Sequence, residues 1–207
     1  MPYQLSFFAA PPDDADLDAD VVVVTRNSPN QWLRSRYGKL QPRGLVVDVV
    51  SAFKERAFCT PMIGVQIRHG NGERGFRPPD LGWFHAQIAD LRAANGGLGI
   101  FLATDSRSVL EQFQTRYPDV ASTEKWYPEQ GAGPLHQNPS CPDRFRNAVE
   151  ALIDIWLLKE CTSLVLSPGF FGRTARYLSW PTHRHARIYP DRTHPTREDK
   201  VDWDNPI

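Results

Sequence analysis

Short apolar runs alternate along this chain with segments whose apolar residues recur at helical spacing. Each run is rich in β-branched residues and is bounded by turn formers, which favours a strand buried on both faces. Strands that alternate with helices form βαβ units, so the pattern predicts an α/β fold with a mainly parallel sheet and helices on both faces. The predicted strands cover residues 21–26, 62–68, 98–105, 163–167 and 186–190, with a further short strand near 120–123.

The helices between these runs have recognisable starts and ends. A helix is predicted to begin after Asp80, a suitable N-cap, and to stop at Asn95-Gly96-Gly97. Another should follow the turn at Pro168. The longest, residues 143–161, is expected to turn Phe145, Ala148, Leu152, Ile155 and Trp156 toward the core. Further helices are predicted over 43–58 and 106–118.

Composition limits the class of protein. Lys plus Arg and Asp plus Glu both number 24, and this balance argues against a dedicated nucleic-acid binder. The three cysteines are scattered without a CxxC pair, which predicts neither disulfides nor a cysteine-based zinc site and indicates a reducing compartment such as the cytoplasm. The N-terminus lacks the features of a secretory signal, and no apolar run reaches the length of a membrane span.

Polar residues and glycines follow three of the predicted strands. They are the segments Arg68 to Glu73, Thr104 to Ser106, and Ser167 to Arg173. Ligands of parallel sheets bind beyond the carboxyl ends of the strands, so these segments should share one rim. A guanidinium and a helix N-terminus both favour phosphate oxygens, and together they suit a diphosphate. Taken singly, each segment also fits an ordinary βα turn.

Other site chemistries find little support. No GxGxxG or GxxxxGK[ST] motif follows a strand, and the segment GFFG is not a nucleophile elbow. The histidines at 183, 185 and 194 cluster near the C-terminus without an acidic neighbour, and a surface role is preferred to metal binding. No metal is predicted.

Three segments resemble, in order and at plausible spacing, the motifs of the fucosyltransferases related to the nodulation α1,6-fucosyltransferase and the animal core α1,6-fucosyltransferase. They are GVQIRHGNGE, FLATDSRSVLEQFQTRYP and ALIDIWLLKECTSLVLSPGFFGRTARYLS, and the resemblance covers roughly residues 60–180. It implies one Rossmann-like half of a GT-B glycosyltransferase. It also implies that GDP-fucose is the donor, a glycan is the acceptor, transfer proceeds with inversion, and no metal or other cofactor is required.

The same resemblance assigns roles to residues. Arg68 would stabilise the charge of the leaving diphosphate, and Glu73 would take the proton of the acceptor hydroxyl. Asp154 would read the guanine edge. The full set expected at the nucleotide and its phosphates is Gln66, His69, Gly70, Asp105, Asp154, Ser167, Gly169, Phe170, Phe171 and Arg173.

Some positions depart from the family pattern. Gln66 stands where a histidine is usual, and the second basic position is His69, whose charge depends on pH. Pro168-Gly169-Phe170 replaces the Ser-Ser-Gln of the animal enzymes, which removes side-chain contacts to phosphate. Trp83 and Phe84 either stack on a sugar ring or belong to the core; the sequence does not choose.

The length of the chain is a further departure. Only about 60 residues precede the first motif, too few for an acceptor domain. The division expected is a leader over 1–42 with one strand, a nucleotide-sugar-binding domain over 43–190, and a polar tail over 191–207. A minimal enzyme, a fragment and a chain that uses a partner's surface all fit. So do a binding module without transferase activity and an unrelated α/β protein.

Overall fold

The structure is a computed structural model that describes residues 40–42, 44–135, 138–179 and 186–190, together with the backbone of two strands near the N-terminus. The chain divides into two compact units, Met1–Arg36 and Tyr37–Ile207. In the first unit, β1 (Leu5–Phe8) pairs in parallel with β2 (Val21–Val24), Leu5 opposite Val21. Strand β1 was not predicted, because its four residues carry no alternation or turn signal that marks a strand.

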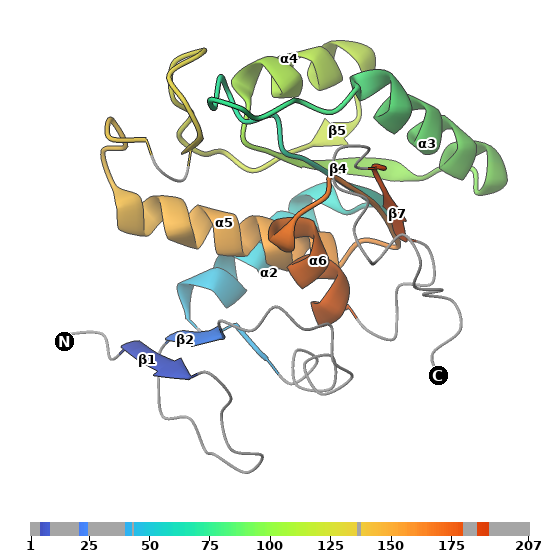
Figure 1. Ribbon diagram of the computed structural model, residues 1–207. Coiled ribbons are helices and arrows are strands. Elements are labelled where there is room, and N and C mark those ends of the chain that lie inside the picture. The colour runs from blue at the N-terminus through green and yellow to red at the C-terminus, as the bar shows by residue number, and fades with distance from the viewer. Residues whose placement is uncertain are drawn as a thin grey trace. The chain divides into compact units, whose positions relative to one another are not determined.

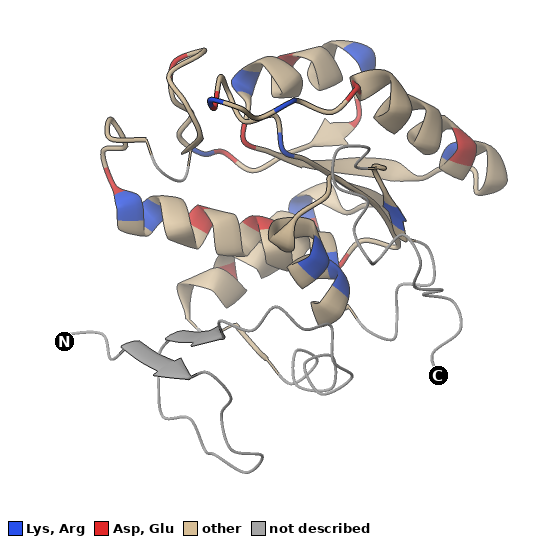
Figure 2. Ribbon diagram, in the orientation of Figure 1, with Lys and Arg blue, Asp and Glu red and all other residues tan. Residues whose placement is uncertain are grey.

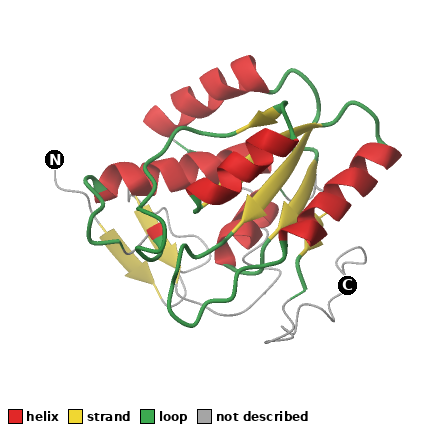
Figure 3. Cartoon of the chain, turned by 90° about the horizontal axis from the view of Figure 1, so that it is seen from above, coloured by secondary structure: helices red, strands yellow, loops and turns green. Residues whose placement is uncertain are grey.

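The second unit is built on a five-stranded parallel sheet with the order β5-β4-β3-β6-β7 (Figures 1 and 3). Strand β3 lies at its centre, with Gln66 opposite Ala103 of β4 and Leu166 of β6. The predicted strands are confirmed with somewhat shorter bounds: β3 (Met62–Ile67), β4 (Gly99–Thr104), β5 (Val120–Ala121), β6 (Ser163–Leu166) and β7 (Ala186–Ile188).

The predicted helices are also present. Asp80 caps α3 by accepting a hydrogen bond from the Gly82 amide at 2.9 Å, and Asp143 caps α5 by accepting from the Arg146 amide at 2.9 Å. Such side-chain acceptors satisfy amides that the first helical turn leaves free. The helices of this unit are α2 (Leu45–Ala57), α3 (Leu81–Ala94), α4 (Arg107–Arg116), α5 (Arg144–Lys159) and α6 (Phe170–Leu178).

The helices form a layer on each face of the sheet (Figure 1). One buried cluster joins the sheet to α2, α5 and α6, with Phe101, Leu157 and Leu164 at its centre. The other joins the opposite face to α3 and α4 through Ile63, Phe84 and Phe113. The predicted α/β fold, a Rossmann-like three-layer sandwich, is therefore confirmed.

The predicted core face of α5 was wrong for Phe145, Ala148 and Leu152, whereas Ile155 and Trp156 pack against the core. Phe145 is 58% exposed, Ala148 and Leu152 are also exposed, and Ile155 and Trp156 are only partly buried. The buried face instead consists of Glu150, Ile153, Asp154, Leu157 and Leu158. The error arose because only apolar residues were counted in the periodicity, whereas two carboxylates occupy the buried stripe of this helix.

The structure also decides between the two roles considered for Trp83 and Phe84. Phe84 is fully buried and stacks on Tyr189 with 5.7 Å between ring centroids, while Trp83 packs edge-on against the same ring. The core alternative is therefore confirmed for Phe84. The histidines at 183, 185 and 194 and the tail over 191–207 lie outside the described residues. None of the helices that the structure describes combines the length and apolar character needed to cross a bilayer.

Candidate functional site: a cavity at the carboxyl edge of the sheet

The strand order creates a topological switch point between β3 and β6. From β3 the chain adds β4 and β5 on one side of the sheet, and β6 and β7 lie on the other. Arg68 follows β3, Ser167 follows β6, and the Arg68 amide donates to Ser167 Oγ at 3.0 Å across this point. Open α/β sheets bind ligands in the crevice at such a switch. The predicted convergence of strand ends is thus observed.

A cavity of about 320 Å³ lies at this edge, at the lower end of the range for small-molecule sites. The ends of β3 and β4 form its floor, α5 forms one wall, and the start of α6 closes one end. Two further residues, Lys125 and Leu135, come from the loop after β5. The lining residues are Gln66, Ile67, Arg68, Ala103, Thr104, Asp105, Lys125, Leu135, Asn147, Glu150, Ala151, Asp154, Phe170 and Phe171.

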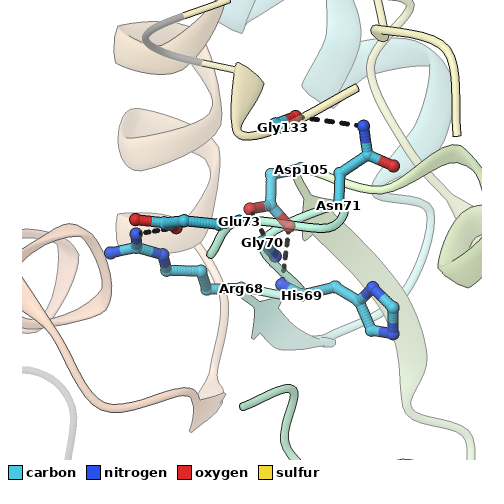
Figure 4. A network of polar contacts seen from close by, with 7 residues as sticks. All are labelled: Arg68, His69, Gly70, Asn71, Glu73, Asp105 and Gly133. Atoms are coloured by element: carbon cyan, nitrogen blue, oxygen red, sulfur yellow. Dashed lines mark hydrogen bonds and ion pairs between the residues drawn. The ribbon is translucent and has the colours of Figure 1, made fainter. Parts of the chain in front are cut away.

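Asp105 holds the loop that follows β3. Its two carboxylate oxygens accept hydrogen bonds from the amides of His69 at 2.7 Å and Gly70 at 3.0 Å (Figure 4). Gly70 has a φ of +76°, and a Cβ there would lie 2.4 Å from the Phe76 ring. Only glycine meets both conditions, because the position combines a left-handed backbone with a close neighbour. The carboxylate therefore fixes the backbone immediately after Arg68.

The two residues predicted to be catalytic contact each other. Arg68 Nη2 lies 2.5 Å from Glu73 Oε2 (Figure 4). The Arg68 guanidinium also lies 4.8 Å from the centroid of the Phe76 ring. Both side chains of the ion pair are partly exposed. Arg68 lines the cavity and Glu73 does not. The pair stands at the border between the cavity and the open surface of the loop.

Asn71 joins this loop to the loop over residues 129–133, a role that the sequence analysis missed. Its Nδ2 donates to the carbonyl of Gly133 at 3.1 Å (Figure 4) and to that of Glu129 at 2.9 Å. Its Oδ1 accepts from the Gly131 amide at 3.2 Å. Asn71 has a φ of +44°, the sole non-glycine value above zero in the described chain. Asparagine is enriched in that conformation, so its place between two glycines was the available signal.

The wall on α5 is built from buried charges. Asp154 accepts a hydrogen bond from Thr123 Oγ1 at 2.6 Å and forms an ion pair with Lys125. The side chains of Lys125 and Asp154 are 6% and 3% exposed. Burial opposes the charge of Lys125, but the Asp154 carboxylate, Tyr127 and Asp105 together outweigh burial and raise the pKa of this ammonium. Lys125 was missed because it lies in a loop segment with no periodicity.

Glu150 lies one helical turn before Asp154 and lines the same cavity. Its Oε1 accepts a hydrogen bond from Arg146 Nε at 2.9 Å. Its Oε2 is buried and has no hydrogen-bond partner among the residues that the structure describes. Sequence reasoning missed Glu150, since a glutamate in a helix usually marks the solvent face.

The start of α6 supplies the remaining predicted residues. Gly169 is its N-cap with a φ of +129°, and Phe170 and Phe171 line the cavity. Gly172 lies close to Gln66, because a Cβ there would be 3.0 Å from Gln66 Oε1. Arg173 donates its amide to the Gly169 carbonyl at 3.4 Å and is not among the lining residues.

The charges of the cavity are sorted by position. The cation Arg68 stands at the switch point with the first amides of α6, and the oxygens of the neighbouring Asp105 already accept from backbone amides. Glu150 and Asp154 stand on α5, a helix that carries residues of both signs (Figure 2), and Lys125 is paired with Asp154. Helix N-termini favour anions and carboxylates favour hydrogen-bond donors. The cavity therefore suits a ligand that is anionic at one end and carries N–H or O–H groups at the other. Within the described residues, no group of three metal-ligating side chains occurs.

Comparison with known proteins identifies the family. The family model of Nodulation protein Z (NodZ) matches residues 7–197. The chain belongs to the NodZ family. A NodZ of Azorhizobium caulinodans is 32% identical over 153 residues, which are 69% of this chain and 44% of that protein. A NodZ of Sinorhizobium fredii is 29% identical over 157 residues, 69% of this chain and 48% of that protein.

Solved structures of NodZ proteins share the fold. The fucosyltransferase NodZ from Bradyrhizobium matches with a TM-score of 0.51 and 25% identity, over 88% of this chain and 57% of that one. A NodZ α-1,6-fucosyltransferase co-crystallized with GDP matches with a TM-score of 0.51 and 23% identity, over 79% of this chain and 52% of that one. The chain thus spans less than half the length of the curated NodZ relatives it matches.

Proposed function

We propose that this NodZ-family chain is the nucleotide-sugar half of a fucosyltransferase that transfers fucose from GDP-fucose to a glycan acceptor. The observation that carries the proposal is the cavity at the switch point, with Arg68 at one end and the buried carboxylate of Asp154 on the opposite wall. Family membership supports the reaction class. The proposed division is a leader over 1–42, this domain over 43–190 and a tail over 191–207, and the proposed compartment is the cytoplasm.

The sorted charges orient the donor. The diphosphate lies against Arg68 and the amides at Gly169 to Phe171, where a cation and a helix N-terminus both favour it. The guanine edge presents neighbouring N–H donors and lies against Asp154. Lys125 and Thr123 hold that carboxylate in place, and each of its oxygens keeps a further lone pair for the base.

The reaction proposed is a direct displacement with inversion and without a metal. The acceptor hydroxyl oxygen forms a bond to C1 of fucose while the bond from C1 to the β-phosphate oxygen breaks. Negative charge develops on the leaving GDP, and Arg68 stabilises it at the stage where the stabilisation accelerates the reaction. The hydroxyl proton passes to Glu73. A diphosphate that binds Arg68 replaces its contact with Glu73 and leaves that carboxylate able to act as the base.

A second candidate is a nucleotide-sugar-binding module that lacks transferase activity by itself. The observation that favours it is coverage, because the chain spans 44% and 48% of two NodZ relatives. In that case the acceptor surface belongs to another chain or segment. The two candidates share the nucleotide site and differ only in whether the chain alone transfers fucose.

The first experiment is thermal unfolding with GDP, ADP, UDP or inorganic phosphate. GDP at about 100 times its dissociation constant should stabilise the protein by about 2.7 kcal/mol, and the other three should not. Arg68→Ala should remove the effect. Arg74→Ala is the matched control, because Arg74 is an exposed cation of the same loop and does not line the cavity.

Transfer assays with GDP-fucose and a glycan panel then separate the two candidates. Fucose transfer by the chain alone, lost in Arg68→Ala and in Glu73→Gln, would support the enzyme. Retention of GDP binding without transfer would support the binding module. Absence of stabilisation by every nucleotide tested would overturn both.

A further inference from the structure

We infer that Glu150 is a second ligand-binding carboxylate of this cavity, whose Oε2 accepts a hydrogen bond from a neutral N–H or O–H group of the nucleoside. The inference rests on the proposed function, since it assumes that a nucleotide occupies the cavity. It adds a residue outside the three segments that resemble the family motifs, and one that determines which nucleosides bind.

The burial of Glu150 carries the inference. The residue is 8% exposed, its Oε2 is buried without a partner among the described residues, and Glu150 is one of the residues that line the cavity. A buried acceptor without a donor is costly, and more so when it carries charge. Protein chains rarely retain such a group unless a ligand or water donates to it. The cavity that Glu150 lines is the place where that donor would lie.

The charge of Asp154 is compensated by a buried cation, but the charge of Glu150 is not. Lys125 and Thr123 are directed to Asp154, whereas the one polar partner of the Glu150 side chain among the described residues is the guanidinium of Arg146, at Oε1. Arg146 is 74% exposed, so solvent weakens this ion pair. Oε2 therefore remains a strong acceptor at the cavity wall, one helical turn from the carboxylate proposed to read the base.

The chemistry of the ligand at this point follows from the acceptor. A carboxylate repels phosphate and cannot donate, so the group it contacts is a neutral donor. We assign that donor to one of two groups of guanosine: the 2-amino hydrogen that Asp154 does not take, or the ribose 2′-hydroxyl. Both are hydrogen-bond donors, and nucleotides that lack one or the other distinguish them.

The test measures dissociation constants of GDP, inosine diphosphate and 2′-deoxyguanosine diphosphate by calorimetry. Inosine diphosphate lacks the 2-amino group and the deoxy nucleotide lacks the 2′-hydroxyl. Glu150→Gln places an amide at Oε2 with little change in shape and should weaken GDP binding about tenfold or more. The analogue that lacks the contacted donor should bind the wild type and the variant equally. Arg146→Ala is the control, because it removes the ion pair and keeps the acceptor.

The unliganded variant supplies a second readout. Glu150→Gln should unfold at the same or a higher urea concentration than the wild type, because it removes a buried charge without a donor. Equal GDP affinity for wild type and Glu150→Gln would overturn the inference, as would a wild type that binds all three nucleotides equally, whether or not the variant folds. If the wild-type protein does not bind GDP at any concentration tested, both the proposed function and this inference are overturned.

Discussion

The two sides of the cavity are built in different ways. The loop after β3 is held by bonds to its backbone: Asp105 accepts from two of its amides, and Ser167 accepts from a third. The wall on α5 is held by an ion pair between buried side chains, Lys125 and Asp154. Bonds to backbone amides can be lost one at a time. Loss of one buried charge leaves its partner uncompensated, so the two sides should respond differently to single substitutions.

The largest effect is expected at the α5 wall. Lys125→Met leaves the Asp154 carboxylate buried without its cation and should lower the free energy of unfolding by about 3–5 kcal/mol. The double substitution Lys125→Met/Asp154→Leu removes both charges and should regain most of that loss. Urea unfolding of the three proteins measures the difference. Equal stability of the single and double variants would show that the pair is not coupled.

A substitution that weakens the loop after β3 should cost less stability than Lys125→Met. Asp105→Asn keeps one acceptor oxygen for the amides of His69 and Gly70 and replaces the other by a donor. We expect a loss of about 2 kcal/mol in the free energy of unfolding, since a hydrogen bond to a charged group contributes about 1.5–3 kcal/mol. Weaker GDP binding should accompany it. Glu111→Gln, which neutralises an exposed acid on α4, should change neither quantity.

Two substitutions of Asn71 separate the contribution of its backbone conformation from that of its side-chain hydrogen bonds. Asn71→Gly permits the φ of +44° and loses the three amide bonds to residues 129–133, which should cost about 1–2 kcal/mol. Asn71→Ala loses the same bonds and is also strained, so it should cost about 1 kcal/mol more. Urea unfolding measures both. Equal stability of Asn71→Ala and Asn71→Gly would show that the left-handed backbone is not the reason why this position favours asparagine.

The smallest effect is expected on the opposite face of the sheet. Burial, with a contribution from Arg116, lowers the pKa of His85, whose Nδ1 lies 2.9 Å from the Tyr117 hydroxyl. Below the unfolded pKa of about 6.5, His85 binds a proton more readily in the unfolded chain than in the folded one, so stability should fall as the pH drops from 7.5 to 5.5.

His85→Gln should lose less stability over that range than the wild type, as measured by urea unfolding at both pH values. The GDP dissociation constant should not differ between the two proteins at either pH, because His85 lies on the helix layer away from the cavity. An equal pH dependence of unfolding in both proteins would remove His85 as its source.

Much of the fold was available from local patterns. Apolar runs and turn residues predicted each strand and helix of the second unit to within a few residues, and the predicted N-cap Asp80 is present. The strand ends predicted that Arg68, Asp105 and Ser167 would share one rim. These features depend on residues close in the chain and on a general property of parallel sheets, so a single sequence can carry them.

The α5 wall and the loop connection at Asn71 required the tertiary structure. Thr123 and Lys125 lie about 30 residues before Asp154, and Asn71 lies about 60 residues before the loop that it binds. No local pattern records such pairings. The sequence by itself determined where the backbone turns and which residues follow each strand. The tertiary structure decided which face of α5 is buried, because a carboxylate can be buried only where a distant cation, hydroxyl or ligand compensates it.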